Sequence, residues 1–500
     1  MKLENLLQQH FNYPSFRKGQ REVISSILEG NHTIAMLPTG TGKSLCYQLP
    51  AYMLTGHVVI VSPLLSLMQD QAEQLMMNGE KRVIAFNSFL TLEEKQQALS
   101  QLYKYKFIFL SPEMLHANYV IQRLTELQIA LFVIDEAHCI SQWGYDFRPD
   151  YHKLGAVREK LGNPLTLALT ATATPEVKED IIQSLSLDNW KEFIYSVDRP
   201  NISLSVEAVD SFPEKTERLI ELVNKLEGPG IIYFSSKKMS EQMASLLRER
   251  GVQDIAAYHG GMEQESRILI QQQFIQGQLN IICATSAFGM GINKENIRYI
   301  IHFHMPLQLE SYLQEIGRAG RDGQKSVAIL LYSPGDEQLP YQLAEGELPS
   351  DDQLTWLYHW ITENPHALKY MSANELEIKR IAGLSDIQWR IIDNFLHSVT
   401  EDQLEESFNL IKNFSKDRLQ VKRQKIKEIY RWIQLTECRR KNILNYFKED
   451  NKIKIEDCCD ICGLDYTKYY VSRTREDVIE GERGFHWKEH LAEILLSERI

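Results

Sequence analysis

Short apolar runs rich in β-branched residues alternate with helical patterns from about residue 30 to residue 335. Five such runs occupy residues 33–37, 58–61, 107–110, 131–134 and 165–169, and three more occupy residues 231–234, 280–284 and 299–303. Continuous apolar runs of this length between helical patterns are typical of parallel strands that are buried on both faces. The pattern therefore predicts two doubly wound α/β domains.

The pattern changes after residue 335. Residues 340–435 lack strand signals and have helical spacing of apolar positions, a cluster of cysteines follows, and residues 487–500 form an amphipathic helical pattern. We therefore expect a helical insertion, a small cysteine-containing unit and a C-terminal tail. The expected domains are residues 1–207, 208–338, 339–430, 431–465 and 466–500.

The amino-acid composition of the 500-residue chain is that of a globular protein, with 43% hydrophobic and 24% charged residues. No apolar run approaches the roughly 18 residues that a membrane-spanning helix needs. The N-terminal segment lacks the apolar stretch of a signal peptide. We expect a cytoplasmic protein that binds no membrane.

Charge is distributed unevenly along the chain. The formal net charge of −12 argues weakly against a nucleic-acid-binding protein, but local patches decide binding more than net charge does. Residues 411–450 contain 12 Lys and Arg against 5 Asp and Glu, whereas residues 340–410 contain 4 against 13. The basic stretch from Lys412 to Lys441 is a candidate for phosphate contacts, with a solvated basic helix as the alternative.

A glycine-rich loop follows the first predicted strand and precedes a helical pattern. Glycines there let backbone N–H groups converge on phosphate oxygens, and the helix N-terminus adds a positive dipole. Lys43 would reach the β- and γ-phosphates, and the hydroxyl of Ser44 would bind Mg²⁺. The loop predicts an ATP site made by Pro38, Thr39, Gly40, Thr41, Gly42, Lys43 and Ser44.

Two carboxylates directly follow the predicted strand at residues 131–134. Side chains at the carboxyl ends of parallel strands face the crevice where open α/β sheets bind ligands. Asp135 would hold Mg²⁺ together with Ser44, and Glu136 would orient or deprotonate the attacking water. Together with the phosphate loop, this pair predicts nucleotide hydrolysis.

Two arginines lie three residues apart in a glycine-rich segment of the second α/β domain. Charge develops on the transferred phosphoryl group, so an arginine there stabilises the transition state. If ATP lies between the domains, Arg321 would be this arginine and Arg318 a supporting contact, both on one face of a helical turn. A surface helix held by salt bridges is the alternative, although such a helix has little need for three glycines in seven residues.

The order of these motifs resembles superfamily 2 helicases, and residues 10–335 resemble the RecQ family of DNA helicases almost continuously. The resemblance implies two RecA-like domains with ATP–Mg²⁺ between them and a single DNA strand across their top face. It also implies ATP-dependent 3′→5′ translocation, duplex unwinding, and roles in repair, recombination and stalled-fork processing. Single-stranded and branched or partly duplex DNA would be the partners, in a cytoplasmic, nucleoid-associated protein.

Residues 16–20 resemble the segment with which the family reads adenine. By that resemblance Gln20 would hydrogen-bond the edge of the base, Tyr13 would stack on its ring, and Arg17 would lie nearby. Without the resemblance, Tyr13 would be an ordinary core aromatic residue.

Residues 141–151 resemble the aromatic-rich loop that couples single-strand binding to ATP hydrolysis in the family. Trp143, Phe147 and Arg148 combine faces on which bases can stack with a cation for phosphate. Packing of Trp143 in the core is the alternative. Other matching segments add four residues for DNA contact or coupling, namely Ser62, His138, Tyr258 and His259.

Four cysteines cluster near the end of the chain, and in a reducing compartment such a cluster indicates a metal site before disulfides. Zn²⁺ takes a tetrahedral set of thiolates, and Cys459 and Cys462 have familiar chelate spacing. Cys458 directly precedes Cys459, so Asp457 or Glu456 could replace it. The block resembles the structural zinc-binding subdomain of RecQ proteins, with Zn²⁺ held by Cys438, Cys458, Cys459 and Cys462.

The region between the motor motifs and the cysteines leaves alternatives open. Residues 372–398 contain two helical patterns around residues 383–385 and resemble a helix-turn-helix. Contact with duplex DNA is one interpretation of this pattern, and plain helical packing is the alternative. Only Lys379, Arg380 and Arg390 are available for phosphates, which speaks against DNA contact.

The 38 residues after Cys462 are too few for the winged-helix domain and the helicase-and-RNase-D C-terminal (HRDC) domain that are usual in the family. The resemblance therefore implies a short bacterial form without these domains. The tail helix would dock on the body or on a protein partner. An RNA helicase, and a translocase or remodelling subunit that moves without unwinding, are the alternative functions.

Overall fold

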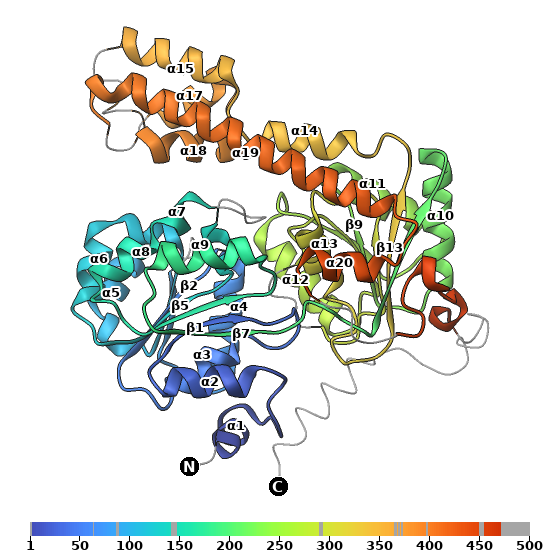
Figure 1. Ribbon diagram of the computed structural model, residues 1–500, viewed down its shortest axis with the longest axis horizontal. Coiled ribbons are helices and arrows are strands. Elements are labelled where there is room, and N and C mark those ends of the chain that lie inside the picture. The colour runs from blue at the N-terminus through green and yellow to red at the C-terminus, as the bar shows by residue number, and fades with distance from the viewer. Residues whose placement is uncertain are drawn as a thin grey trace, which may run out of the picture.

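Two α/β domains lie side by side, and a helical segment extends from the second domain across the first (Figure 1). The computed structural model describes residues 3–63, 65–86, 90–141, 148–289, 294–364, 368, 371, 374–396, 399–449 and 455–471. No helix within these ranges is long and apolar enough to cross a membrane. The predicted tail helix lies outside them.

The first domain is built on a parallel sheet with the strand order β3-β4-β2-β5-β6-β1-β7. Its strands are β1 (His32–Met36), β2 (His57–Val61), β3 (Val83–Phe86), β4 (Phe107–Leu110), β5 (Ile129–Ile134), β6 (Thr166–Thr170) and β7 (Trp190–Ile194). Its helices are α1 (Leu3–Phe11), α2 (Gln20–Leu28), α3 (Leu45–Ala51), α4 (Leu65–Met77), α5 (Leu92–Ser100), α6 (Asn118–Thr125), α7 (Pro149–His152), α8 (Leu154–Lys160) and α9 (Pro175–Leu185), with 3₁₀ turns η1 (Leu102–Lys104), η2 (Pro112–His116) and η3 (Ala137–Ile140).

The second domain is built on another parallel sheet, with the order β10-β11-β9-β12-β13-β8. Its strands are β8 (Ile202–Ala208), β9 (Gly230–Tyr233), β10 (Ile255–Tyr258), β11 (Ile281–Ala284), β12 (Tyr299–His302) and β13 (Ser326–Tyr332). Its helices are α10 (Phe212–Lys225), α11 (Lys237–Glu249), α12 (Gln264–Ile275) and α13 (Leu309–Ile316). Because β8 pairs with β13 along its whole length, the second sheet already begins at Ile202, before the boundary expected after residue 207.

Both sheets are buried on two faces, as the continuous apolar runs predict. Each predicted run forms a strand within two residues of its expected ends. One face of the first sheet packs a core around Phe132 and Ile134, and the other packs a core around Leu131 and Val133. Alternate side chains of one strand point to opposite faces of the sheet, so each strand packs helices on both faces. Burial of such side chains stabilises the fold by roughly 1.5–3 kcal/mol each.

Helices continue the chain after the second sheet, which confirms the helical prediction for the described part of residues 340–435. They are α14 (Gln338–Gly346), α15 (Asp351–Glu363), α17 (Glu375–Ala382), α18 (Asp386–Leu396), α19 (Leu404–Ile433) and α20 (Arg439–Tyr446), with η4 (Glu401–Gln403), η5 (Asp460–Cys462) and η6 (Tyr466–Tyr469). The first part of α19 packs with α15, α17 and α18, and its last part packs on the second domain (Figure 1). This single helix crosses the boundary expected between residues 430 and 431.

Candidate functional site

The glycine-rich loop connects β1 to α3, in the context that the sequence predicts. Gly40 and Gly42 have positive φ angles of 84° and 72°, which glycine adopts without a steric cost. The Thr41 hydroxyl donates to the Pro38 carbonyl at 2.7 Å and closes the turn. Lys43 and Ser44 follow directly, and α3 begins at Leu45.

The side chains expected to act on phosphate meet at the carboxyl ends of β1, β5 and β6. Lys43 Nζ lies 3.4 Å from Glu136 Oε1, and His138 Nδ1 lies 3.4 Å from Glu136 Oε2. His138 Nδ1 is also 2.9 Å from the hydroxyl of Thr170. Glu136 has a left-handed backbone with φ of 50°, a strained conformation for a residue with a Cβ and one found often at active sites.

The two adjacent carboxylates have opposite pKa shifts. Burial, reinforced by the neighbouring Glu136 charge, raises the pKa of Asp135. Burial acts on Glu136 in the same direction, but the charges of Lys43 and His138 outweigh it and lower the pKa of Glu136. Glu136 is therefore the ionised acceptor at neutral pH, and a cation at Asp135 would favour the charged form of that carboxylate as well.

Two of the predicted adenine-reading residues contact the phosphate loop. The Gln20 carboxamide donates to the carbonyls of Thr41 and Gly42 at 2.7 and 3.0 Å and accepts from the Arg17 backbone N–H at 2.8 Å. Arg17 donates to the Gly40 carbonyl at 2.5 Å and pairs at 2.8 Å with Glu295 of the second domain. Tyr13 is half exposed, and its ring stacks on that of Phe11.

The two predicted arginines follow α13 in a turn that faces the phosphate loop. Hydrogen bonds from Arg318 and Ala319 to residues three positions earlier continue α13, and Gly320 then adopts a φ of 53° that ends the helical geometry. Arg318 and Arg321 therefore lie on either side of this break and share no helical face. A Cβ on Gly40 would be 2.8 Å from Cγ of Arg321, so the Arg321 side chain packs directly on the loop.

Positive charge is concentrated where the two domains meet. Burial and then the charges of Arg318, Arg199 and Arg17 lower the pKa of Arg321 to about 9. Sequence reasoning missed Arg199, which donates to the Thr39 carbonyl at 3.1 Å and the Gly317 carbonyl at 2.9 Å. Its only sequence signal is the polar run at residues 198–201 between the two domains. Several mutually repelling cations in one place favour a polyanionic ligand.

Residues expected to contact DNA fall into one group in each domain. In the first domain, Arg148 donates to the Pro63 carbonyl at 2.8 Å, beside buried Ser62 at the end of β2. In the second, Tyr258 and His259 follow one another at the end of β10, and both are buried.

Specific partners hold the second-domain pair. The Tyr258 hydroxyl accepts from Gln271 at 3.0 Å, and His259 Nε2 lies 2.8 Å from a Glu241 oxygen. Trp143 and Phe147 lie outside the described residues.

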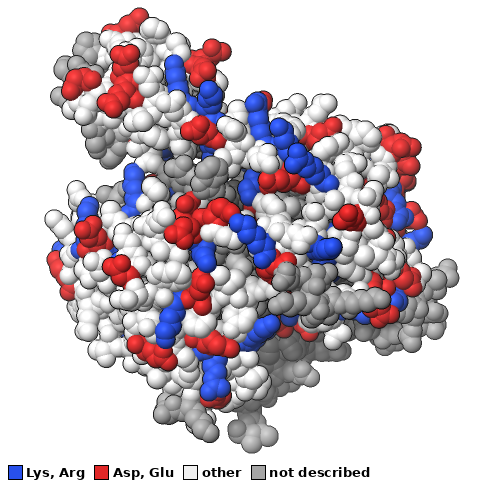
Figure 2. Space-filling model, viewed as in Figure 1, with Lys and Arg blue, Asp and Glu red and all other residues white. Residues whose placement is uncertain are grey.

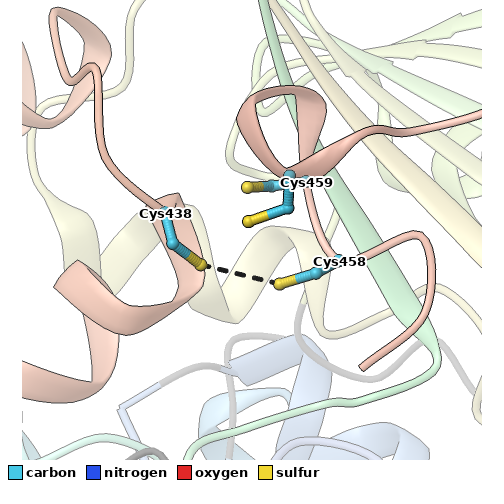
Figure 3. Close-up of side chains that lie close together, drawn as sticks. Cys438, Cys458 and Cys459 are labelled. Atoms are coloured by element: carbon cyan, nitrogen blue, oxygen red, sulfur yellow. Dashed lines mark hydrogen bonds between the residues drawn. The ribbon is translucent and has the colours of Figure 1, made fainter. Parts of the chain in front are cut away.

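The four clustered cysteines meet in space, with all sulfur atoms within 4.8 Å of one another. Cys438 at the start of α20 points toward Cys458, with their sulfurs 3.7 Å apart (Figure 3). A tetrahedral zinc with bonds of about 2.3 Å separates its sulfur ligands by about 3.8 Å, so the cluster fits Zn²⁺. Asp457 is instead bound to Lys468 at 2.8 Å, which favours Cys458 as the fourth ligand.

Several cations of the helical segment are paired. In the predicted helix-turn-helix, formed by α17 and α18, Lys379 pairs with Glu375 and Asp386. Along α19, Arg423 pairs with Glu345 at 2.7 Å and Lys425 with Glu310 at 2.5 Å. Figure 2 shows basic side chains gathered along α19 over the second domain, with acidic side chains beside them. Phosphate contacts by Lys379, Arg423 or Lys425 would have to replace these ion pairs.

Three family models match successive parts of the chain. Residues 17–181 match the DEAD/DEAH box helicase model, residues 214–323 match the helicase conserved C-terminal domain, and residues 399–463 match the RecQ zinc-binding model. The last match begins before the unit expected at residues 431–465 and includes all of α19.

Known proteins resemble the chain over different lengths. It is 46% identical over 476 residues to the probable ATP-dependent DNA helicase RecS of Bacillus subtilis, covering 94% of this chain and 93% of that protein. It is 44% identical over 334 residues to the ATP-dependent DNA helicase RecQ of Haemophilus influenzae, covering 66% of this chain but only 53% of the relative. A putative ATP-dependent RNA helicase of Acanthamoeba polyphaga mimivirus is 34% identical, covering 93% of this chain and 72% of that protein.

Proposed function

The chain belongs to the RecQ family of DNA helicases, and we propose that it couples ATP hydrolysis to 3′→5′ movement on single-stranded DNA and to duplex unwinding. The observation that carries this proposal is the packing of Arg321, from the second domain, on Gly40 of the phosphate loop. A site completed by two domains couples the state of its ligand to their relative position.

The phosphate loop would hold ATP through its backbone N–H groups and Lys43. Mg²⁺, held by Ser44 and Asp135, would neutralise charge on the phosphates. Glu136, ionised and fixed between Lys43 and His138, would accept a proton from the attacking water or orient it. Arg321, with Arg318 behind it, would stabilise the charge that develops on the transferred group.

The DNA strand would cross both domains along the segments that contain the residues expected to contact it. Ser62 and Arg148 would contact it on the first domain, and the segment around Tyr258 and His259 would contact it on the second. His138 links this face to the ATP site, because its imidazole lies 3.4 Å from Glu136 and its segment leads into residues 141–151. Single-stranded and branched or partly duplex DNA would be the substrates, in repair, recombination and processing of stalled forks.

Strand displacement tests the proposal directly. With ATP and Mg²⁺, the full chain is expected to unwind a partial duplex that carries a 3′ single-stranded tail and to leave the matched 5′-tailed duplex intact. ATP hydrolysis stimulated by DNA without unwinding would establish the translocase instead. Equal stimulation and unwinding with RNA would contradict the DNA preference and agree with the name of the mimiviral relative.

Trp143→Ala is expected to leave basal ATP turnover within about twofold of wild type and to abolish most of its stimulation by single-stranded DNA. A base-stacking aromatic residue contributes about 1–3 kcal/mol per base, so its loss uncouples strand binding from hydrolysis. Turnover is measured with and without a poly(dT) strand, and Trp190→Ala is the control because Trp190 lies on the edge strand β7. Loss of the basal rate together with the thermal transition would support core packing of Trp143.

A further inference from the structure

We propose that Arg199 is a positioning residue that couples the two halves of the ATP site, and that Arg440 of the zinc-binding unit holds it in place. The inference rests on the proposed ATPase function. It makes the zinc-binding unit part of the machinery that sets the rate of hydrolysis, in addition to its structural role.

The Arg199 guanidinium joins the two domains through four backbone carbonyls. On the first domain it donates to Thr39 O at 3.1 Å, within the phosphate loop. On the second it donates to Gly317, Ala319 and Gly320 at 2.9, 3.0 and 2.8 Å, respectively. Because these residues lead into Arg321, Arg199 fixes the turn that carries the proposed catalytic arginine against the loop that would hold ATP.

The space around this contact is nearly filled. A Cβ on Gly317 would lie 1.9 Å from Oγ1 of Thr39, so only glycine lets the arginine turn approach the phosphate loop this closely. A cavity of about 30 Å³ remains beside it. Its lining includes residues of the phosphate loop, of the linker between the two domains (residues 197–201), of α13 and of α20. The four segments therefore meet at one point, where a small displacement of Arg199 would be transmitted to Arg321.

The zinc-binding unit forms hydrogen bonds with the linker on both sides of Arg199. Arg440, buried at the start of α20, donates to the Asp198 carboxylate, to the Arg199 carbonyl at 3.1 Å and to the Ile202 carbonyl. Glu449 accepts from the Val197 backbone N–H at 3.0 Å. These contacts fix the backbone from which the Arg199 side chain extends toward the ATP site.

The same arginine lies next to the metal cluster. Arg440 is two residues from Cys438, and its guanidinium lies beside the thiol of Cys458. The Cys458 carbonyl accepts from the Leu204 backbone N–H at 3.3 Å, which ties the cluster to β8. The cysteine cluster thus holds the Arg440 side chain in place. Arg440 in turn fixes the backbone of the linker, and this backbone positions the Arg199 side chain.

Steady-state ATP hydrolysis with saturating single-stranded DNA tests the role of Arg199. Arg199→Lys and Arg199→Ala are both expected to lower kcat by roughly 10- to 100-fold with a change in KM for ATP below about threefold, because lysine cannot reach four carbonyls with a planar fork. Arg218→Ala is the matched control. Arg218 is also half-buried, and it pairs with Glu207 and Glu221 of the second domain at 2.6 Å each, outside the arginine turn, so kcat of this variant should stay near wild type.

The link through Arg440 is tested by a variant that leaves zinc and the Arg199 side chain in place. Asp198→Ala removes a partner of Arg440 and should lower kcat about three- to tenfold with unchanged zinc content. Combined with Arg199→Ala, it should lower kcat no further than Arg199→Ala alone, because both changes act on one connection.

Four outcomes separate this inference from the proposed function. If wild type hydrolyses no ATP, the proposed function fails. If wild type is active and Arg199→Lys retains kcat within twofold, the positioning role fails. An equal loss of kcat in Arg218→Ala would show that the effect of the Arg199 variants is general destabilisation. If the losses in kcat of Asp198→Ala and Arg199→Ala multiply in the double variant, the two changes act independently, and Arg440 does not act through Arg199.

Discussion

Lys43→Ala is expected to lower DNA-stimulated ATP hydrolysis by at least about 100-fold, since a positioned donor to a developing phosphoryl charge contributes about 10²–10³ in rate. Lys43 is the cation at the end of the phosphate loop, and its partner in the structure is Glu136 at 3.4 Å. Its removal would take away both the contact to the phosphates and the charge that keeps Glu136 ionised. Hydrolysis is measured as phosphate release at saturating ATP and DNA.

Lys81→Ala is the matched control for this experiment. Lys81 is an exposed lysine of the same domain, in the segment between α4 and β3, and its removal should leave the rate unchanged. Thermal unfolding of Lys81→Ala should coincide with that of wild type, whereas Lys43→Ala should remain cooperatively folded with a lowered midpoint, because buried Glu136 loses its partner. A Lys43→Ala protein that still hydrolyses ATP within tenfold of wild type would contradict the proposed ATP site.

Cys459→Ser is expected to abolish stoichiometric zinc binding and to lower the thermal midpoint by many degrees. Structural zinc sites contribute about 10–16 kcal/mol of apparent binding free energy, and this free energy is coupled to folding. Cys459 is fully buried, forms the C-x-x-C chelate with Cys462, and pairs with Leu204 of β8 through a backbone bridge. Zinc per chain, measured by mass spectrometry of metal content, should fall from about one to near zero.

Cys283→Ala is the control for the zinc experiment. Cys283 is a buried thiol in β11, away from the cluster, so this variant should lose some stability but keep about one zinc per chain. Retention of zinc by Cys459→Ser would show that the cluster binds it differently or not at all. Cys458→Ser should also lose zinc, whereas Asp457→Asn should retain it, because the Asp457 carboxylate is bound to Lys468 and Lys325.

Features encoded in contiguous residues were predictable from the sequence. The phosphate loop between β1 and α3, the carboxylates after β5 and the C-x-x-C pair each depend on short stretches, where local geometry follows from residue type and spacing. The eight predicted runs all form buried strands, because burial on both faces requires continuous apolar runs. Strands β3, β8, β10 and β13 were not among the predicted runs, although β13 is buried along its whole length. Edge strand β7 was also missed, because it carries exposed Lys191 and Glu192 and lacks such a run.

Other features depend on contacts between distant residues. The break at Gly320 that separates Arg318 from Arg321 is stabilised by hydrogen bonds from Arg199 and Asn201, whose positions only the folded chain brings near. The sequence left Cys458, Asp457 and Glu456 open as the fourth ligand. The folded chain favours Cys458, because its sulfur lies within 4.8 Å of the other three and the Asp457 carboxylate is bound to Lys468. The acidic partners of the basic stretch on α19 are likewise distant in sequence, since Arg423 and Lys422 pair with Glu345 and Glu347 at the end of α14 and just after it.

The sequence alone determined that this chain contains a nucleotide-hydrolysing motor with a cysteine cluster, because each motif contains most of its own chemistry within a few residues. Only the tertiary structure decided how these parts act on one another. Arg199 reaches Thr39 across 160 positions, and Arg440 reaches Asp198 across 242. Such contacts leave no periodic signal in the sequence, since a single arginine has the same local pattern whether it faces solvent or joins two domains.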